Sequence, residues 1–188
     1  MAFGVAQPAW AETASSTPHH AESTHHNSIE FGLGATALAA FEDKGTESHS
    51  GSHFGVGLSV TVPVIPNWLE VELMGRMINI ERGLAYPIDL MLRKPFVISE
   101  HVHLYVALGP SMVVYSRRKE SAESGAEPVV AESGRESGVY FGVASAVGVD
   151  LWLTPRYGVF IEPNFNVYWH EGATIKEVGG VAGAMVGF

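Results

Sequence analysis

The sequence predicts an all-β fold: a closed antiparallel transmembrane β-barrel of about eight strands, preceded by a disordered N-terminal segment. Two observations lead to this prediction. From Ser28 onward, apolar residues recur with a period of two, and Gly, Pro, Asn or Ser ends each alternating run. No apolar run reaches the length of about 18 residues that a transmembrane helix needs, so a membrane crossing has to use strands.

Length and composition set the limits of the prediction. The 188 residues fit one domain, and 46% hydrophobic residues, 21 glycines and a mean hydropathy of +0.14 suit an apolar, closely packed sheet. The chain has no cysteine, which excludes disulfides and thiolate metal sites. A net charge of -9 disfavours nucleic acid as a partner, because phosphate binding needs a clustered basic surface. We expect no cofactor.

The N-terminal residues are predicted to lie outside the barrel. Residues 1–11 end in Ala9-Trp10-Ala11, with small residues at the two positions that a signal peptidase reads, and are interpreted as the remnant of a signal peptide. An ordinary disordered terminus is the alternative. Residues 12–27 form a polar, His-rich segment that we expect to be disordered and periplasmic.

Two histidine pairs in this segment are candidate metal ligands. His19, His20, His25 and His26 could bind a divalent transition metal as neutral imidazoles. Their spacing matches no closed zinc site, so a solvated tail without metal is the alternative.

The barrel is predicted over residues 28–188. The clearest strand is 157–170, where Tyr157, Ile161 and Trp169 share an apolar face and Glu162 lies on the polar one. Bulky residues are expected to face lipid and small or polar residues to fill the interior. Seven other runs follow the rule, at about 28–43, 53–65, 68–82, 87–98, 101–117, 138–154 and 177–188.

The connections between these runs are predicted to alternate in length. Tight turns are expected at Pro66-Asn67, Ser99-Glu100 and Thr154-Pro155-Arg156, with longer polar loops between them. The longest loop, Arg118 to Ser137, is rich in Glu, Ser and Gly. Both ends of the barrel domain should then lie on the side of the tight turns.

The alternation also places charged side chains in the lumen. These side chains include both acidic and basic residues, which can pair with each other, and buried charges need such pairing and hydrogen bonds in a narrow interior. His103 and Tyr105 are expected on the same inner face. A structural network is the first interpretation, and a catalytic or conducting site is the alternative. The predicted lumen residues are Glu70, Glu72, Arg76, Asp89, Arg93, Asp150 and Glu162.

A lipid-modifying enzyme is a second possibility that the residues leave open. His170 with Glu171 lies at a loop-side strand end, and Ser116 and Ser137 are near the same rim. A nucleophilic mechanism needs a hydroxyl, a histidine and a carboxylate within hydrogen-bond reach. No motif connects these residues, so we predict no catalytic residue.

Four segments resemble a group of small uncharacterised eight-stranded outer-membrane β-barrel proteins of Gram-negative bacteria. Phe188 ends a strand with Val186, Ala184 and Ala182 on the same face, which resembles the terminal signal that the barrel assembly machinery reads. The other segments are Leu90–Phe96, Val106–Pro110 and Phe160–Phe165. The resemblance implies the bacterial outer membrane as location, with lipid, lipopolysaccharide and the assembly machinery as partners.

The sequence therefore favours a non-enzymatic integral outer-membrane barrel with a structural or surface-interaction role and, at most, a narrow pore. A lipid-modifying barrel enzyme is the alternative. A soluble lipocalin-like carrier is the second alternative, and it requires the bulky residues to face inward.

Overall fold

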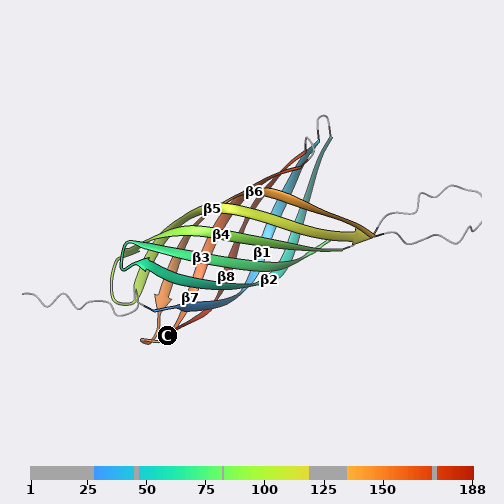
Figure 1. The fold of residues 1–188 in the computed structure, drawn as a ribbon. Helices are drawn as coiled ribbons and strands as arrows, with labels where there is room; N and C mark the ends of the chain where they lie inside the picture. Colours follow the sequence, from blue (N-terminus) through green and yellow to red (C-terminus); the bar gives the residue numbers. More distant parts are fainter. Residues whose placement is uncertain (1–27, 45–46, 82, 119–134, 171–172) are drawn as a thin grey trace, which may run out of the picture.

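A single closed sheet makes up the described part of the chain. The computed structural model describes residues 28–44, 47–81, 83–118, 135–170 and 173–188. Each strand pairs with the next, and β1 also pairs with β8 (Figure 1). The strands are β1 Glu30–Lys44, β2 Glu47–Ile65, β3 Leu69–Ile80, β4 Gly83–Val97, β5 Val102–Arg118, β6 Arg135–Trp152, β7 Tyr157–His170 and β8 Ala173–Gly187. The predicted eight-stranded antiparallel barrel is confirmed.

The first and last strands close the barrel over almost their whole length. Their register runs from Glu30 opposite Gly187 to Asp43 opposite Thr174. Beyond it, the Phe188 amide donates to the Ile29 carbonyl at 3.0 Å, and the Phe188 ring meets Phe31 edge-on. The sheet thus has no unpaired edge strand, which a membrane-embedded sheet could not tolerate.

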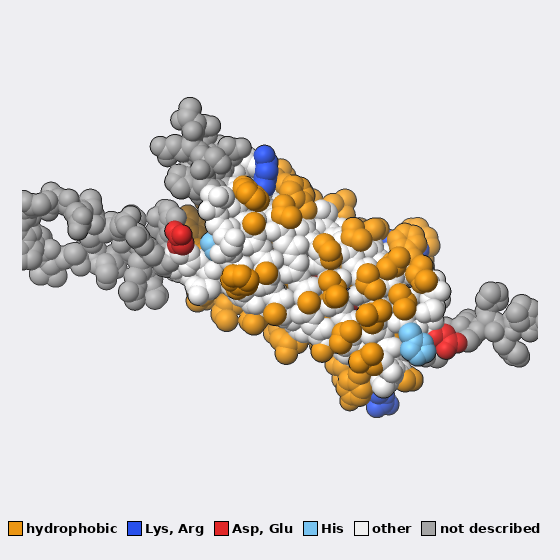
Figure 2. All heavy atoms as spheres, turned by 180° about the vertical axis from the view of Figure 1, so that it is seen from behind, with side chains coloured by type: hydrophobic (Ala, Val, Ile, Leu, Met, Phe, Trp, Pro, Cys, Tyr) orange, Lys and Arg blue, Asp and Glu red, His pale blue; other side chains and the backbone are white. Residues whose placement is uncertain are grey.

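Side chains alternate between lipid-facing and interior positions as the sequence predicts. The outward residues Leu58 and Phe141 are 64% and 65% exposed, whereas the inward Ala144 and Tyr168 are 1% exposed. On the face in Figure 2, hydrophobic side chains cover the barrel wall and charged side chains gather near its two ends. An apolar wall around a polar interior is the architecture of a transmembrane barrel. No helix in the described ranges is long and apolar enough to cross a membrane.

The three predicted tight turns connect β2 to β3, β4 to β5 and β6 to β7 at one end of the barrel. Asn67 has a φ of 59°, a left-handed conformation that asparagine adopts at low cost. The Thr154 hydroxyl accepts hydrogen bonds from the Arg156 and Tyr157 amides at 3.3 and 3.0 Å. We call this the turn end, and the opposite end the hairpin end.

The prediction of longer connections at the hairpin end is wrong for three of the four. Only residues 45–46, 81–82 and 171–172 separate the strand ends there, whereas residues 119–134 separate β5 from β6. The strands themselves continue further than predicted: β2 begins at Glu47 instead of residue 53, and β8 at Ala173 instead of residue 177. The β2 extension contains no apolar residue and the β8 extension adds only Ala173 and Ile175, too short a run for period-two patterning to detect, so backbone pairing with a neighbouring strand defines both.

Prolines lie inside strands and interrupt single ladders. The prediction began the fourth strand at Pro87, but β4 begins at Gly83 and runs through this residue. The β3–β4 ladder skips the positions of Pro87 and Tyr86 without a change of register, because proline has no amide hydrogen to donate. The ladders between β4 and β5 and between β6 and β7 skip Pro110 and Pro163 in the same way.

Interior volume generates the first testable prediction. A Cβ at the inward Gly148 would lie 2.5 Å from Cε1 of the buried Tyr105 ring, whereas a Cβ at the outward Gly75 would meet nothing within 4 Å. Gly148→Ala should therefore lower the free energy of unfolding by about 1–3 kcal/mol. Gly75→Ala, the matched control, should change it by less than about 0.5 kcal/mol. Urea unfolding in lipid vesicles measures both, and equal effects would contradict this packing.

Candidate functional site

The barrel interior concentrates ionisable groups, and it is the candidate functional site. Among the described residues, two buried guanidinium groups, Arg76 and Arg93, are outnumbered by seven buried carboxylates. All seven residues predicted for the lumen lie inside. The buried carboxylates are Glu30, Glu70, Glu72, Asp89, Asp150, Glu162 and Glu177.

Sequence reasoning missed two of these carboxylates, Glu30 and Glu177. Both obey the alternation, because Glu30 lies on the same side of β1 as Gly32, and Glu177 on the same side of β8 as Val181. Both lie inside the predicted runs 28–43 and 177–188, so continuing the alternation to the first positions of these runs places both inside the barrel.

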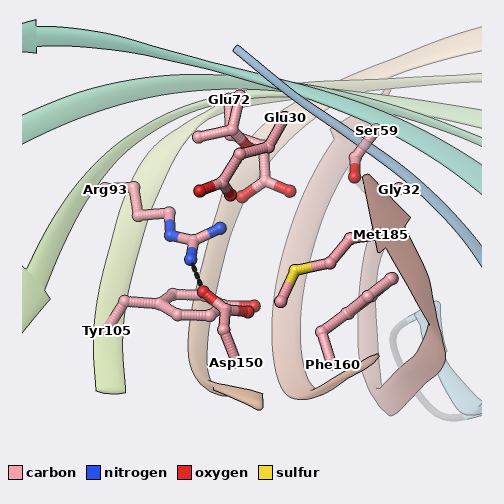
Figure 3. Close-up of a pocket in the computed structure, with 10 residues that line it drawn as sticks. Glu30, Gly32, Ser59, Glu72, Arg93, Tyr105, Asp150, Phe160 and Met185 are labelled. Carbon is pink, nitrogen blue, oxygen red and sulfur yellow. Dashed lines mark hydrogen bonds and ion pairs between the residues drawn. The ribbon is translucent and has the colours of Figure 1, made fainter. Parts of the chain in front are cut away.

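The Arg93 cluster, formed by Arg93, Glu70, Asp150, Tyr105 and Glu162, lies towards the turn end. The Arg93 guanidinium donates to Asp150 (Figure 3). Its Nε lies 3.2 Å from Glu70 Oε2. Its Cζ is 3.5 Å from the centre of the Tyr105 ring. The Tyr105 hydroxyl donates to Glu162 Oε2 at 2.7 Å. One arginine thus connects two carboxylates directly and stacks on the ring that binds a third.

Trp152 and His103 lie beside this cluster at the turn end. Trp152 is 2% exposed, and its indole Nε1 donates to Nδ1 of the equally buried His103 at 3.2 Å. Trp152 ends β6 on the inward side, and also packs with Met74 and Phe160. A large aromatic side chain therefore fills the interior where the turns begin.

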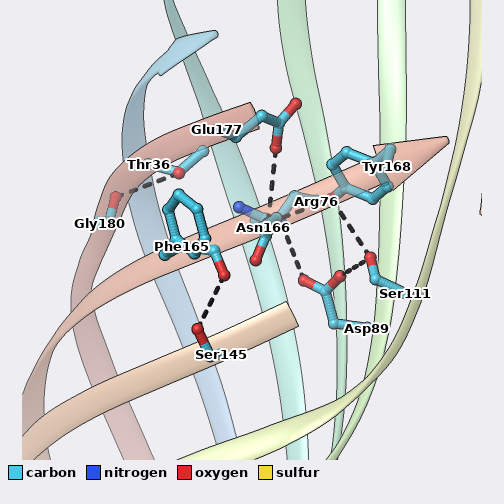
Figure 4. A network of polar contacts seen from close by, with 10 residues as sticks. All are labelled: Thr36, Arg76, Asp89, Ser111, Ser145, Phe165, Asn166, Tyr168, Glu177 and Gly180. Atoms are coloured by element: carbon cyan, nitrogen blue, oxygen red, sulfur yellow. Dashed lines mark hydrogen bonds and ion pairs between the residues drawn. The ribbon is translucent and has the colours of Figure 1, made fainter. Parts of the chain in front are cut away.

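The Arg76 cluster, formed by Arg76, Asp89, Ser111, Asn166 and Tyr168, lies further towards the hairpin end. Arg76 Nη2 donates to Asp89 Oδ2 at 2.8 Å, and the other Asp89 oxygen accepts a hydrogen bond from Ser111 (Figure 4). The Ser111 and Tyr168 hydroxyl oxygens are 3.2 Å apart. Asn166 Nδ2 donates to the Tyr168 hydroxyl at 3.1 Å and to Glu177 Oε2 at 3.5 Å, and turning the amide over would instead place its oxygen 2.8 Å from Arg76 Nη2.

Apolar side chains fill the interior beyond the Arg76 cluster. Leu38, Ile78, Ala85, Val113 and Tyr168 form a buried hydrophobic cluster, against which Tyr115, Tyr140 and Ile175 pack. This apolar plug was not predicted, because single inward apolar residues near strand ends look like irregularities in a polar-inward pattern. Two charged clusters and an apolar plug therefore occupy the lumen in sequence along its axis.

These contacts support a structural role for most of the charges. A carboxylate or guanidinium taken out of water is tolerated only when it is paired and hydrogen-bonded. Arg93 has two carboxylate partners and Arg76 has one. Of the four buried carboxylates without an ion pair to a described residue, Glu162 and Glu177 accept hydrogen bonds from Tyr105 and Asn166. Glu30 and Glu72 are the two groups for which neither kind of contact accounts.

The other candidate residues lie partly outside the described residues. Ser116 and Ser137 are directly opposite each other on β5 and β6. His170 is the last residue of β7, but its side chain and Glu171 lie outside the described part, as do His19, His20, His25 and His26. Within the described part, no three His, Asp or Glu side chains are grouped to hold a metal ion.

Comparison with solved structures supports the fold. Neisserial surface protein A shares 16% identity with the chain at a TM-score of 0.61, covering 84% of this chain and 97% of that one. OprG from Pseudomonas aeruginosa shares 12% identity at a TM-score of 0.57, covering 87% of this chain and 97% of that one. Ail of Yersinia pestis, in complex with the heparin analogue sucrose octasulfate, shares 14% identity at a TM-score of 0.51, covering 84% of this chain and 98% of that one. The sequence matches no family model and no curated protein.

The chain therefore has the fold of the small outer-membrane β-barrels. These structures are less than 20% identical to it, so the likeness is one of architecture and carries no activity.

The paired charges generate the second prediction. Arg93→Met should lower the free energy of unfolding by about 3–5 kcal/mol, because it leaves Glu70 and Asp150 buried beside no cation. Lys94→Met is the matched control: it removes the same charge from the next residue, whose side chain points outward near Trp68 and Phe96. We expect a change below about 1 kcal/mol for it. Urea titration of both variants in vesicles measures these changes in the free energy of unfolding. A loss for Arg93→Met as small as that for Lys94→Met would contradict the structural role of the Arg93 ion pairs.

Proposed function

We propose that the chain is an integral protein of the bacterial outer membrane, non-enzymatic, with a structural or surface-interaction role and a plugged lumen. One observation carries the proposal: the outward side chains of all eight strands are largely apolar and exposed, while the buried charged residues of the described part lie inside. This arrangement reverses that of a water-soluble protein, and only a lipid surround stabilises it.

The soluble carrier is the alternative that this arrangement disfavours most. A lipocalin-like protein would need an apolar cup inside and a polar wall outside. Leu58, Phe141 and Val147 are between 58% and 65% exposed, and they belong to an apolar wall far larger than an ordinary soluble surface carries. The Arg93 and Arg76 clusters also occupy the part of the interior where such an apolar cup would lie.

The filled lumen argues against a general porin. Arg93, Arg76 and their partners span the interior from several strands, and the apolar plug follows towards the hairpin end. An eight-stranded barrel encloses little more volume than its own side chains need. Solute passage would require these clusters to separate, so we propose that the protein does not conduct in its resting state.

The proposed partners contact the outside of the barrel. Lipid and lipopolysaccharide would cover the apolar wall. The assembly machinery would read the C-terminal strand, where Phe188 is 76% exposed. A surface-interaction role would depend on the hairpin end, where β1 and β2 and also β5 and β6 reach furthest from the C-terminus (Figure 1). A lipid-modifying enzyme remains less favoured, because it rests only on the register of Ser116 and Ser137.

Gel mobility and conductance test the proposal together. Protein recovered from purified outer membranes should run as a compact band in detergent that shifts on boiling, because a closed barrel resists the detergent until it is heated. In planar bilayers, it should give no sustained conductance steps. Detergent-free solubility would overturn the membrane assignment, and sustained steps would overturn the plugged lumen.

A charged substitution on the outer wall tests whether that wall faces lipid, as the proposal requires. Val147 is 58% exposed, near the middle of the apolar wall and opposite Val106 of β5. In lipid vesicles, Val147→Arg should lower the free energy of unfolding by about 2–4 kcal/mol, because a charge then faces hydrocarbon. Val147→Leu, the control, should be close to neutral. A soluble carrier would tolerate the arginine as readily as the leucine.

A further inference from the structure

The interior contains a small cavity that the charge pairs do not fill. It has room for about one water molecule. All eight strands contribute to its lining, which includes Glu30, Ser59, Thr61, Glu72, Asp150 and Met185. The cavity lies in the half of the barrel nearer the turn end, since Glu30 begins β1 and Met185 is close to the end of β8.

Two acidic side chains face this cavity without an ion-pair partner among the described residues. Figure 3 shows the Glu30 and Glu72 carboxylates side by side, with Arg93 on one side and Met185 on the other. Glu72 is only 2% exposed, and its Oε2 accepts no hydrogen bond from any described residue. A buried carboxylate oxygen in this state lacks the partner that nearly all such atoms have.

The nearest positive charge is already committed. Arg93 lines the same cavity, but its guanidinium donates to Asp150 and lies beside Glu70. In ionised form, Arg93 with these two carboxylates carries one net negative charge, and Glu30 and Glu72 would add two more. A cation bound in the cavity would compensate this charge, which no described side chain does, and the cavity has space for one small ion.

We propose that this cavity binds one divalent cation of the calcium type. Two carboxylates and two nearby hydroxyl-bearing residues, Ser59 and Thr61, supply the hard oxygen atoms that such an ion prefers. One dication also balances the charge of Glu30 and Glu72. Ca²⁺ fits better than Mg²⁺, because Mg²⁺ retains several waters in an octahedral shell and the cavity has room for about one.

Glu30 is the more exposed of the two carboxylates: it is the first residue of β1, at the rim of the turn end, and it is 7% exposed. Binding would join β1 to β3 through their carboxylates, two strands that do not pair with each other.

The test measures Ca²⁺ itself on the full chain, refolded in zwitterionic detergent without lipopolysaccharide, which binds divalent ions. Isothermal titration should give about one site per barrel. Glu72→Gln, which keeps the shape and removes the charge, should weaken Ca²⁺ binding by at least about tenfold. Glu177→Gln is the matched control, since it removes a buried interior carboxylate that does not line the cavity and should leave the affinity unchanged.

Thermal unfolding provides a second measurement that does not depend on heats of binding. Ca²⁺ should raise the unfolding temperature of the wild type and of Glu177→Gln but not of Glu72→Gln, because a ligand that binds only the folded state stabilises it. Mg²⁺ should have a smaller effect at equal concentration. Absence of Ca²⁺ binding at millimolar concentration, equal binding by Glu72→Gln, or equal loss in Glu177→Gln would overturn the proposal.

Discussion

The fixed volume inside a closed eight-stranded sheet is the constraint on which the rest of this structure depends. Once β1 pairs with β8, the interior cannot widen to admit a larger side chain. Large interior residues are therefore accommodated by glycines. Gly148 leaves room for the Tyr105 ring, Gly142 for Tyr168, and Gly187 for the edge of the Trp152 indole. The high glycine content of the chain is partly a consequence of this complementarity.

The same constraint determines how the charges are paired. Tyr105 fits against Gly148, and in that position its ring supports the Arg93 guanidinium while its hydroxyl reaches Glu162. Arg93 in turn reaches Asp150, which lies on a strand that does not pair with its own. With Glu70, the cluster thus connects the five strands β3 to β7 across the lumen. Because pairs of this kind cost much to break and little to keep, they favour one packing of the interior over its alternatives.

The sequence was sufficient for the fold and for the face on which each residue lies, because a period of two assigns every side chain in a strand once one is assigned. The same alternation predicted Glu70, Arg93 and Asp150 as interior residues. It could not predict that Arg93 meets Asp150, since residues 57 positions apart meet only through the stagger of the closed sheet. Strand limits were predicted least well at Pro87 and beyond the apolar wall, where backbone pairing alone defines the strand.

The polar and apolar surfaces of the barrel indicate where a specific activity would have to reside. The wall is apolar and contacts lipid without discrimination, and the interior is occupied by its own side chains. At the turn end, the connections between strands are tight and the strand ends are close to the C-terminus. The hairpin end differs, because strands there continue past the apolar wall and carry exposed polar residues such as Ser50 and Ser52. Because the interior packing and the ladders fix the fold, the hairpin end can vary without altering it, and this is the reason that the proposed surface-interaction role is placed there.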